Sequence, residues 1–143
     1  MLLASLTGLA SEQIEPAGSL AVPRKNHTAT VLPDGRVVVI GGENNFGQLN
    51  SAEIFDPATK SFVNAGAMSQ ARVGHAATLL PNGTVLVTGG RNESGALTTA
   101  EIFDPAGVAN FRMVSAQLGA PRVRHTSTLL VNGTVLLKRV LIN

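Results

Sequence analysis

The apolar residues of this chain come in short runs that are separated by glycine, proline, asparagine and aspartate. Residues 37–40 (VVVI), 85–87 (VLV) and 135–137 (VLL) are uncharged and wholly apolar. Runs of this length, bounded by turn-forming residues, predict strands that are buried on both faces. No stretch keeps a helical period with capping residues at its ends. The pattern therefore predicts an all-β chain without a substantial helix.

Each of these runs follows a turn signal. Asn82-Gly83 separates two apolar runs, and Asp34-Gly35 and Asn132-Gly133 occupy the same place elsewhere in the chain. Such pairs favour a two-residue type I′ turn, because both of its central residues need positive φ. The sequence thus predicts β-hairpins with type I′ turns.

Each hairpin forms the first half of a four-stranded unit. A double glycine ends the second strand in two of the units, at Gly41, Gly42, Gly89 and Gly90, where unusual dihedrals or close packing are required. A polar loop and a third strand follow, as at residues 98–103, and an Asp-Pro pair stops that strand because proline cannot donate to the ladder. A weak fourth strand is expected around Phe62 and around Phe111.

The unit repeats along the chain. Residues 24–42 align with residues 72–90 at a constant offset of 48, and the same offset relates AEIFDP at 52–57 to AEIFDP at 100–105. A third copy starts at Arg122, at an offset of 50 from the second copy. The two extra residues fall in the connection after the second Asp-Pro pair, as expected of stacked units. Four strands per unit at this period predict the blades of a β-propeller.

The order of residues within the unit resembles the kelch repeat. Arg-x-x-His, an apolar strand, Gly-Gly, an acidic and apolar strand ending in Asp-Pro, and an aromatic residue follow one another, and the likeness covers nearly the whole chain from Gly18 onward. Kelch repeats usually carry Tyr in the third strand and Trp in the fourth. Phe55 and Phe103 stand for the Tyr here, and Phe62 and Phe111 stand for the Trp. The resemblance implies a partial β-propeller of kelch-type, four-stranded antiparallel blades.

On this basis the chain divides into four segments. Residues 1–17 are an N-terminal remnant or a poor signal-like segment, 18–66 the first blade, 67–117 the second, and 118–143 a truncated third blade that adds two strands. A closed propeller needs roughly four to eight blades. Two blades and part of a third therefore predict a truncated product or a piece of a longer protein, and the alternative is a ring assembled from several chains.

The polar and glycine residues that recur in the units are interpreted as structural. They are Arg24, Arg72 and Arg122; His27, His75 and His125; Gly41, Gly42, Gly89 and Gly90; Glu53 and Glu101; and Asp56 and Asp104. Each histidine lies in a different blade without a second ligand at local spacing, so no metal site is expected. Its ring is expected to hydrogen-bond the backbone of its own or the next blade.

The recurring arginines and aspartates have two interpretations each. We expect each arginine to form an inter-blade ion pair, with Glu53 or Glu101 as its partner. The alternative is a ring of guanidinium groups that faces a channel and binds anions. Asp56 and Asp104 precede proline and resemble Asx-turn residues. Two carboxylates in separate blades lack the close spacing of an acid–base pair, so no catalytic residue is expected.

The amino-acid composition excludes several kinds of catalytic and metal-binding site. The 143 residues include no Cys, Tyr or Trp, which excludes disulfides, thiolate metal sites and cysteine nucleophiles. Galactose oxidase, whose catalytic domain consists of kelch-like blades, relies on Tyr, Cys and His, so the resemblance does not carry its copper and radical chemistry to this chain. A net charge of +2 and five aromatic residues, all Phe, do not indicate a nucleic-acid surface. No stretch approaches the roughly 20 apolar residues of a transmembrane helix.

The N-terminus and the sequons bear on the compartment. Gly8 and Ala10 suit a small-x-small cleavage site, but no basic residue precedes the short apolar run, which makes a poor signal peptide. Sequons begin at Asn26, Asn82, Asn92 and Asn132, and they matter only in a glycosylating compartment. The compartment stays open, with export as one alternative.

These features together predict a non-catalytic binding or scaffold module without a cofactor or a metal. The polar loops at 43–49 and 91–96 differ between the units, as loops that bind partners do. The expected partner is another protein or further propeller blades, and apolar edges at 37–40 and 135–137 also favour self-association. The alternative is a remnant of a galactose-oxidase-like or carbohydrate-binding propeller that lacks catalytic residues.

Overall fold

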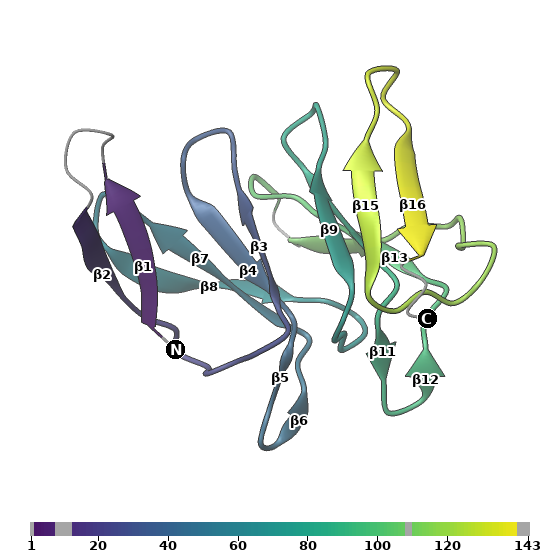
Figure 1. Cartoon of the computed structure of the whole chain (residues 1–143), viewed down its shortest axis with the longest axis horizontal. Coiled ribbons are helices and arrows are strands. Elements are labelled where there is room, and N and C mark those ends of the chain that lie inside the picture. Colours follow the sequence, from purple (N-terminus) through teal and green to yellow (C-terminus); the bar gives the residue numbers. More distant parts are fainter. Residues whose placement is uncertain (1, 8–12, 108–109, 140–143) are drawn as a thin grey trace.

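The protein consists of antiparallel β-sheets, as the computed structural model in Figure 1 shows, and the structure describes residues 2–7, 13–107 and 110–139. The first four-stranded sheet contains β3 (Thr28–Val31), β4 (Val37–Ile40), β7 (Ser51–Asp56) and β8 (Ser61–Ala67), in that spatial order. The second contains β9 (Ala76–Leu79), β10 (Val85–Thr88), β13 (Ala100–Phe103) and β14 (Phe111–Met113), in the same order. No helix occurs among the described residues. The predicted all-β fold with kelch-type blades is confirmed.

The third unit contributes a two-stranded sheet of β15 (His125–Leu129) and β16 (Val135–Arg139). The first strands of the three units, β3, β9 and β15, lie side by side in Figure 1, and β9 contacts both of its neighbours. The chain thus forms two full blades and the inner half of a third. The segment boundaries remain predictions, and β8 extends one residue past position 66, to Ala67.

The connections contain more structure than the sequence predicted. The polar loops fold into small hairpins, β5 (Glu43–Asn44) with β6 (Gly47–Gln48), and β11 (Arg91–Asn92) with β12 (Gly95–Ala96). Both project from the end of the molecule opposite to the hairpin turns of the blades (Figure 1). An Asx contact stabilises each tip. The Asn44 side chain accepts a hydrogen bond from the N–H of Phe46, and the Asn92 side chain accepts one from the N–H of Ser94.

The N-terminal segment is also more regular than a frayed end or a lone strand remnant. β1 (Leu2–Thr7) pairs antiparallel with β2 (Gln13–Ser19), and β2 contacts the outer strand β8 of the first blade. The predicted cleavage positions Gly8 and Ala10 lie outside the described residues.

The predicted type I′ turns are wrong. In each hairpin a three-residue loop replaces the expected two-residue loop: the Leu80 carbonyl accepts the N–H of Gly83, and the Leu80 N–H donates to the Thr84 carbonyl. Only the glycine has positive φ, as at Gly83 (φ 84°), and Asn82 does not. This is the pattern of a type I turn followed by a glycine bulge. Pro81 favours it because proline suits the first central position of a type I turn.

The core lies between the first two blades. It is formed by buried apolar residues of both sheets and of their connections, namely Leu32, Val38, Ile40, Ala52, Ile54, Ala65, Met68, Val85, Val87 and Phe103. The paired phenylalanines of each blade contact each other with tilted rings, at centroid distances of 5.1 Å (Phe55 and Phe62) and 5.0 Å (Phe103 and Phe111). The expectation of an exposed apolar edge at 37–40 is wrong, because β4 lies between β3 and β7 and its residues 38–40 are buried.

Candidate functional site

The recurring arginine and glutamate of each full blade form an ion pair inside that blade. Arg24 Nη2 lies 2.9 Å from Glu53 Oε1, and Arg72 Nη2 lies 3.1 Å from Glu101 Oε1. Both residues of each pair are buried. The predicted partners are therefore right, but the prediction that the pair joins two blades is wrong. Each arginine precedes the first strand of the sheet whose third strand carries its glutamate.

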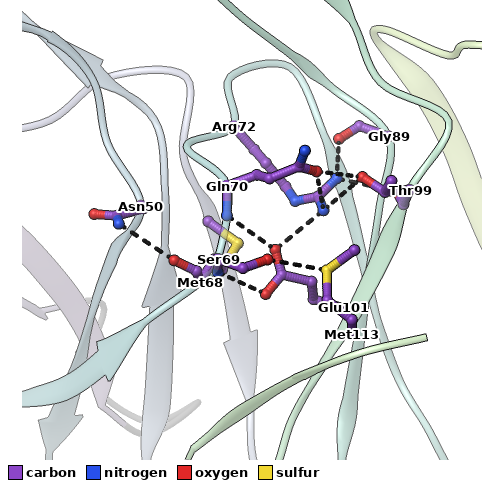
Figure 2. A network of polar contacts seen from close by, with 9 residues as sticks. All are labelled: Asn50, Met68, Ser69, Gln70, Arg72, Gly89, Thr99, Glu101 and Met113. Atoms are coloured by element: carbon purple, nitrogen blue, oxygen red, sulfur yellow. Dashed lines mark hydrogen bonds and ion pairs between the residues drawn. The ribbon is translucent and has the colours of Figure 1, made fainter. Parts of the chain in front are cut away.

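Backbone groups complete the surroundings of each glutamate. Glu53 accepts the N–H groups of Ala21 (2.8 Å) and Val22 (3.1 Å). Glu101 accepts those of Ser69 (2.9 Å) and Gln70 (3.3 Å), which Figure 2 shows together with Arg72. We call the guanidinium and the two N–H groups the glutamate socket. Three donors around a buried carboxylate offset its loss of water.

The arginines also bind backbone carbonyls, so they do not line a channel. Arg72 Nη1 donates to the carbonyls of Gly89 (2.8 Å) and Thr99 (3.0 Å), and Arg24 Nη1 donates to the corresponding carbonyls of Gly41 and Ser51. Burial lowers the pKa of Arg72, while Glu101 acts in the opposite direction. The alternative of a guanidinium ring that binds anions is wrong for these two residues.

The double glycines form the joint between neighbouring units. Gly41 has a φ of +62°, and a Cβ placed on it would lie 2.8 Å from the Arg72 carbonyl oxygen and 2.9 Å from the His75 ring. Gly42 donates its N–H to the same carbonyl at 2.9 Å. Gly89 likewise lies against the Arg122 carbonyl and the His125 ring, and Gly90 donates its N–H to the Arg122 carbonyl. Only residues without a side chain allow this approach.

His75 and His125 each contact a threonine side chain of the preceding unit, where the prediction had given each ring a backbone partner. His75 Nε2 lies 2.9 Å from Thr28 Oγ1, and His125 Nε2 lies 2.8 Å from Thr88 Oγ1. Burial and the nearby Arg72 lower the pKa of His75 to about 4. Burial also lowers the pKa of His125 and of His27. The lowered pKa values favour neutral rings at neutral pH, and the rings of His75 and His125 link adjacent units.

The two Asp-Pro aspartates serve as turn residues. The side chain of Asp56 accepts the N–H of Ala58 at 2.8 Å, and that of Asp104 accepts the N–H of Ala106 at 2.9 Å. These are Asx turns, which end the third strand of each blade.

The end that carries the small hairpins has the exposed features of a binding surface. A hollow of about 310 Å³ is lined by Pro23, Arg24, Lys25, Glu43, Asn44, Asn45 and Phe46. Phe46, at the tip of the β5–β6 hairpin, is 98% exposed. Sequence reasoning described this segment only as a polar loop. The available signal was a single aromatic residue within NNFG.

A second hollow lies where the three units meet. Its volume is about 240 Å³, and it is lined by Asn26, His27, Val73, Gly74, His75, Arg91, Val123 and Arg124. Arg91 approaches Glu43 of the neighbouring hairpin at 3.9 Å. The structure thus brings together His27 and His75, which the sequence assigned to separate blades. Among the described residues there is no group of three or more histidine or acidic side chains that could hold a metal ion.

In the same described part of the chain, no helix is long and apolar enough to cross a membrane.

Comparison with known protein families matches residues 23–69 to the Kelch motif. The matched segment holds Arg24, His27, the first double glycine, Glu53 and the strands of the first blade. A comparison with curated proteins finds no match. The second unit copies the matched segment in sequence, at an offset of 48, and in strand order. Residues 23–69 are therefore a kelch motif, and the second unit repeats that motif in sequence and in strand order.

Proposed function

We propose that the protein is a non-catalytic binding module that holds a protein partner on the end carrying the β5–β6 and β11–β12 hairpins. The observation that carries this proposal is Phe46. It is an almost fully exposed aromatic side chain beside a hollow, on a tip that an Asx contact from Asn44 holds in place. Aromatic residues dominate the binding energy of protein interfaces, and a preorganised tip lowers the entropy lost on binding.

The charges around Phe46 indicate the character of the partner. Lys25 borders the same hollow, and Arg91 and Arg124 border the neighbouring one. The one carboxylate among the lining residues is that of Glu43, which Arg91 approaches. A partner segment with an apolar side chain and flanking acidic groups suits this surface, because complementary charge speeds association and sets orientation.

A non-catalytic role is supported by how the recurring polar residues are used. Buried arginine–glutamate pairs, Asx turns and joints between units account for the recurring residues of the two full blades. A galactose-oxidase-like activity is not proposed, because the sequence has no Cys or Tyr. Sugar binding is disfavoured, because Phe46 is the one phenylalanine in the linings of the two hollows, which contain no tyrosine or tryptophan for a sugar face.

Selection of a displayed random peptide library on the protein tests the proposal. Peptides that bind the wild-type chain should bind Phe46→Ser at least about 10-fold more weakly, the loss typical of an aromatic anchor. Val31→Ser is the matched control, since Val31 is also exposed but is the last residue of β3, whose turn lies at the opposite end of the molecule in Figure 1. Saturable binding that Val31→Ser weakens and Phe46→Ser leaves unchanged would overturn the assigned surface.

A further inference from the structure

The hollow where the three units meet gathers positions at which the units differ. Asn26, Gly74 and Arg124 occupy one place in the repeat, directly before the histidine of each Arg-x-x-His signature, and all three line the hollow. Arg91 also lines it, at the place where the first unit has Glu43. The framework around these positions is constant from unit to unit. Variation on a constant framework is typical of a surface that binds a ligand.

The backbone is left-handed at all three of these matched positions. The φ angle is 55° at Asn26, 66° at Gly74 and 52° at Arg124. Glycine and asparagine adopt this conformation readily, whereas arginine adopts it at a cost. The Arg124 N–H donates to the Gly74 carbonyl at 2.7 Å, which fixes this turn against the second unit. A long charged residue kept in a strained turn is a reason to expect that its side chain has a use.

Gly74 leaves room for the Arg124 side chain beside the hollow. A Cβ at position 74 would lie 3.1 Å from Cγ1 of Val123 and 3.4 Å from Cγ of Arg124. A larger residue at position 74 would therefore push against the stem of the arginine and take up part of the hollow. The second unit thus has a glycine at the place where the third unit brings its charge.

The charged side chains that line the hollow are positive. Arg91 of the second unit and Arg124 of the third are both exposed. Among the described residues of the lining there is no carboxylate. Glu43 lies beside it, where Oε1 accepts the Asn26 amide N–H at 2.8 Å and Oε2 lies 3.9 Å from Arg91 Nη2. Because a guanidinium has five N–H donors, Arg91 keeps donors for a ligand beside this distant contact.

Two guanidinium groups on different units suit an anion with oxygens on several sides. Guanidinium binds phosphate through pairs of parallel N–H bonds, and charge-assisted bonds of this kind are strong. We propose that the hollow is a binding site for a phosphate group, which Arg91 and Arg124 hold together. The site differs from the buried arginines of the repeat, whose charges are used inside the blades. It is separate from the Phe46 hollow and does not depend on the proposed function.

Titration of the isotope-labelled full chain with inorganic phosphate, followed by NMR at constant ionic strength, tests the site. The amide signals of Asn26 and Gly74 should shift and reach saturation, whereas sodium chloride should not move them. Arg124→Gly should weaken phosphate binding by at least about 10-fold, because it removes a charged donor of two bonds. This variant copies the residue of the second unit and relieves the left-handed turn, so the fold should be preserved.

A matched arginine elsewhere separates the site from general charge attraction. Arg112 is an exposed arginine of β14 (Phe111–Met113) and is not part of the hollow. Arg112→Gln should change the affinity for phosphate by less than about twofold. Arg124→Lys keeps the charge but loses the planar fork, so its affinity should lie between those of the wild type and Arg124→Gly.

Two further ligands define the chemical class. Acetate should bind more weakly than phosphate, because it carries one charge and two oxygens. O-phosphoserine presents the same phosphate group on a larger molecule. Affinity similar to that of inorganic phosphate would extend the site to phosphorylated molecules, and binding of inorganic phosphate alone would assign it to the free ion.

Several results would overturn the proposal. One is a set of shifts that grows without saturation or spreads over exposed lysines and arginines. Equal losses in Arg124→Gly and Arg112→Gln would indicate general charge attraction, and acetate binding as tight as that of phosphate would contradict the assigned anion. If Arg124→Gly does not fold, Arg91→Gln provides the same test and should also weaken binding by at least about 10-fold.

Discussion

The second and third units begin with the same signature and then differ in what surrounds it. Arg72 is 0% exposed and binds Glu101 and two carbonyls, whereas Arg122 is half-buried and binds no described residue through its side chain. Val87 is buried between two strands, and its counterpart Leu137 lies on an open strand. The Arg-x-x-His signature therefore prepares a site, and the third strand completes it.

A truncation in the second unit should have the largest effect. Phe103 is 0% exposed and packs on Phe111 and the inter-blade core. Phe103→Ala should lower the free energy of unfolding by about 3–5 kcal/mol, because it leaves a cavity. Leu136→Ala in the third unit should cost under about 1 kcal/mol, because that side chain is half exposed. Urea melts of both variants provide the measurement. A small loss for Phe103→Ala would mean that the blades do not pack as described.

Arg72 and Arg122, which occupy the same place in the second and third units, allow a second test of this difference. Arg72→Ala should lower the free energy of unfolding by about 3–5 kcal/mol, because it leaves Glu101 buried without its charged partner. Arg122→Ala should change it by less than about 1 kcal/mol. The double variant Arg72→Ala/Glu101→Ala serves as the control, and it should lose less than the two single losses combined. Equal losses for the two arginines would show that the third unit is completed by contacts not seen here.

Acid should weaken the joint between the first two units. The pKa of His75 is lowered from 6.5 to about 4 by burial and by Arg72. Below pH 6.5 the His75 side chain is protonated in the unfolded chain, whereas in the folded chain it becomes protonated only near pH 4. Stability should therefore fall as the pH drops through this window, by on the order of 3 kcal/mol, and stay level above it.

Urea melts between pH 4 and pH 8 on the wild-type chain and on His75→Asn measure this effect. The variant should show a flatter dependence in the same window. The lowered pKa values of His27 and His125 act in the same direction and leave a residual slope. Parallel curves for the two proteins would contradict the assignment to His75.

Exposed polar contacts should matter least. Thr98 donates its hydroxyl to Gln117 at 3.2 Å on the surface. Thr98→Ala should lower the free energy of unfolding by well under about 1 kcal/mol. The same urea melts measure it, with Phe103→Ala as the large reference. A loss comparable to that of Phe103→Ala would show that the Thr98 side chain is part of the packed core.

The sequence could not predict a contact wherever the repeat spacing allows two different pairings of the same residues. Arg72 precedes Glu101 in its own unit and follows Glu53 of the unit before, so the repeat permitted either pairing. The structure selects the first, because the arginine lies beside the third strand of its own sheet. Asn-Gly and Asp-Gly pairs likewise suit more than one turn, and Pro33 and Pro81 favour the three-residue form.

The sequence by itself determined the strand order, the number of complete sheets and the recurrence of the signature residues. The strand pattern and the repeat offset can be read directly from the order of residues along the chain, because neither depends on which residues come into contact in the folded state. Only the tertiary structure decided which glutamate Arg24 and Arg72 bind, that Phe46 is exposed at a hairpin tip, and that the side chain of Arg122 has no partner among the described residues. These three features depend on which surfaces pack together in the folded chain. Identical residues in successive units have different neighbours there.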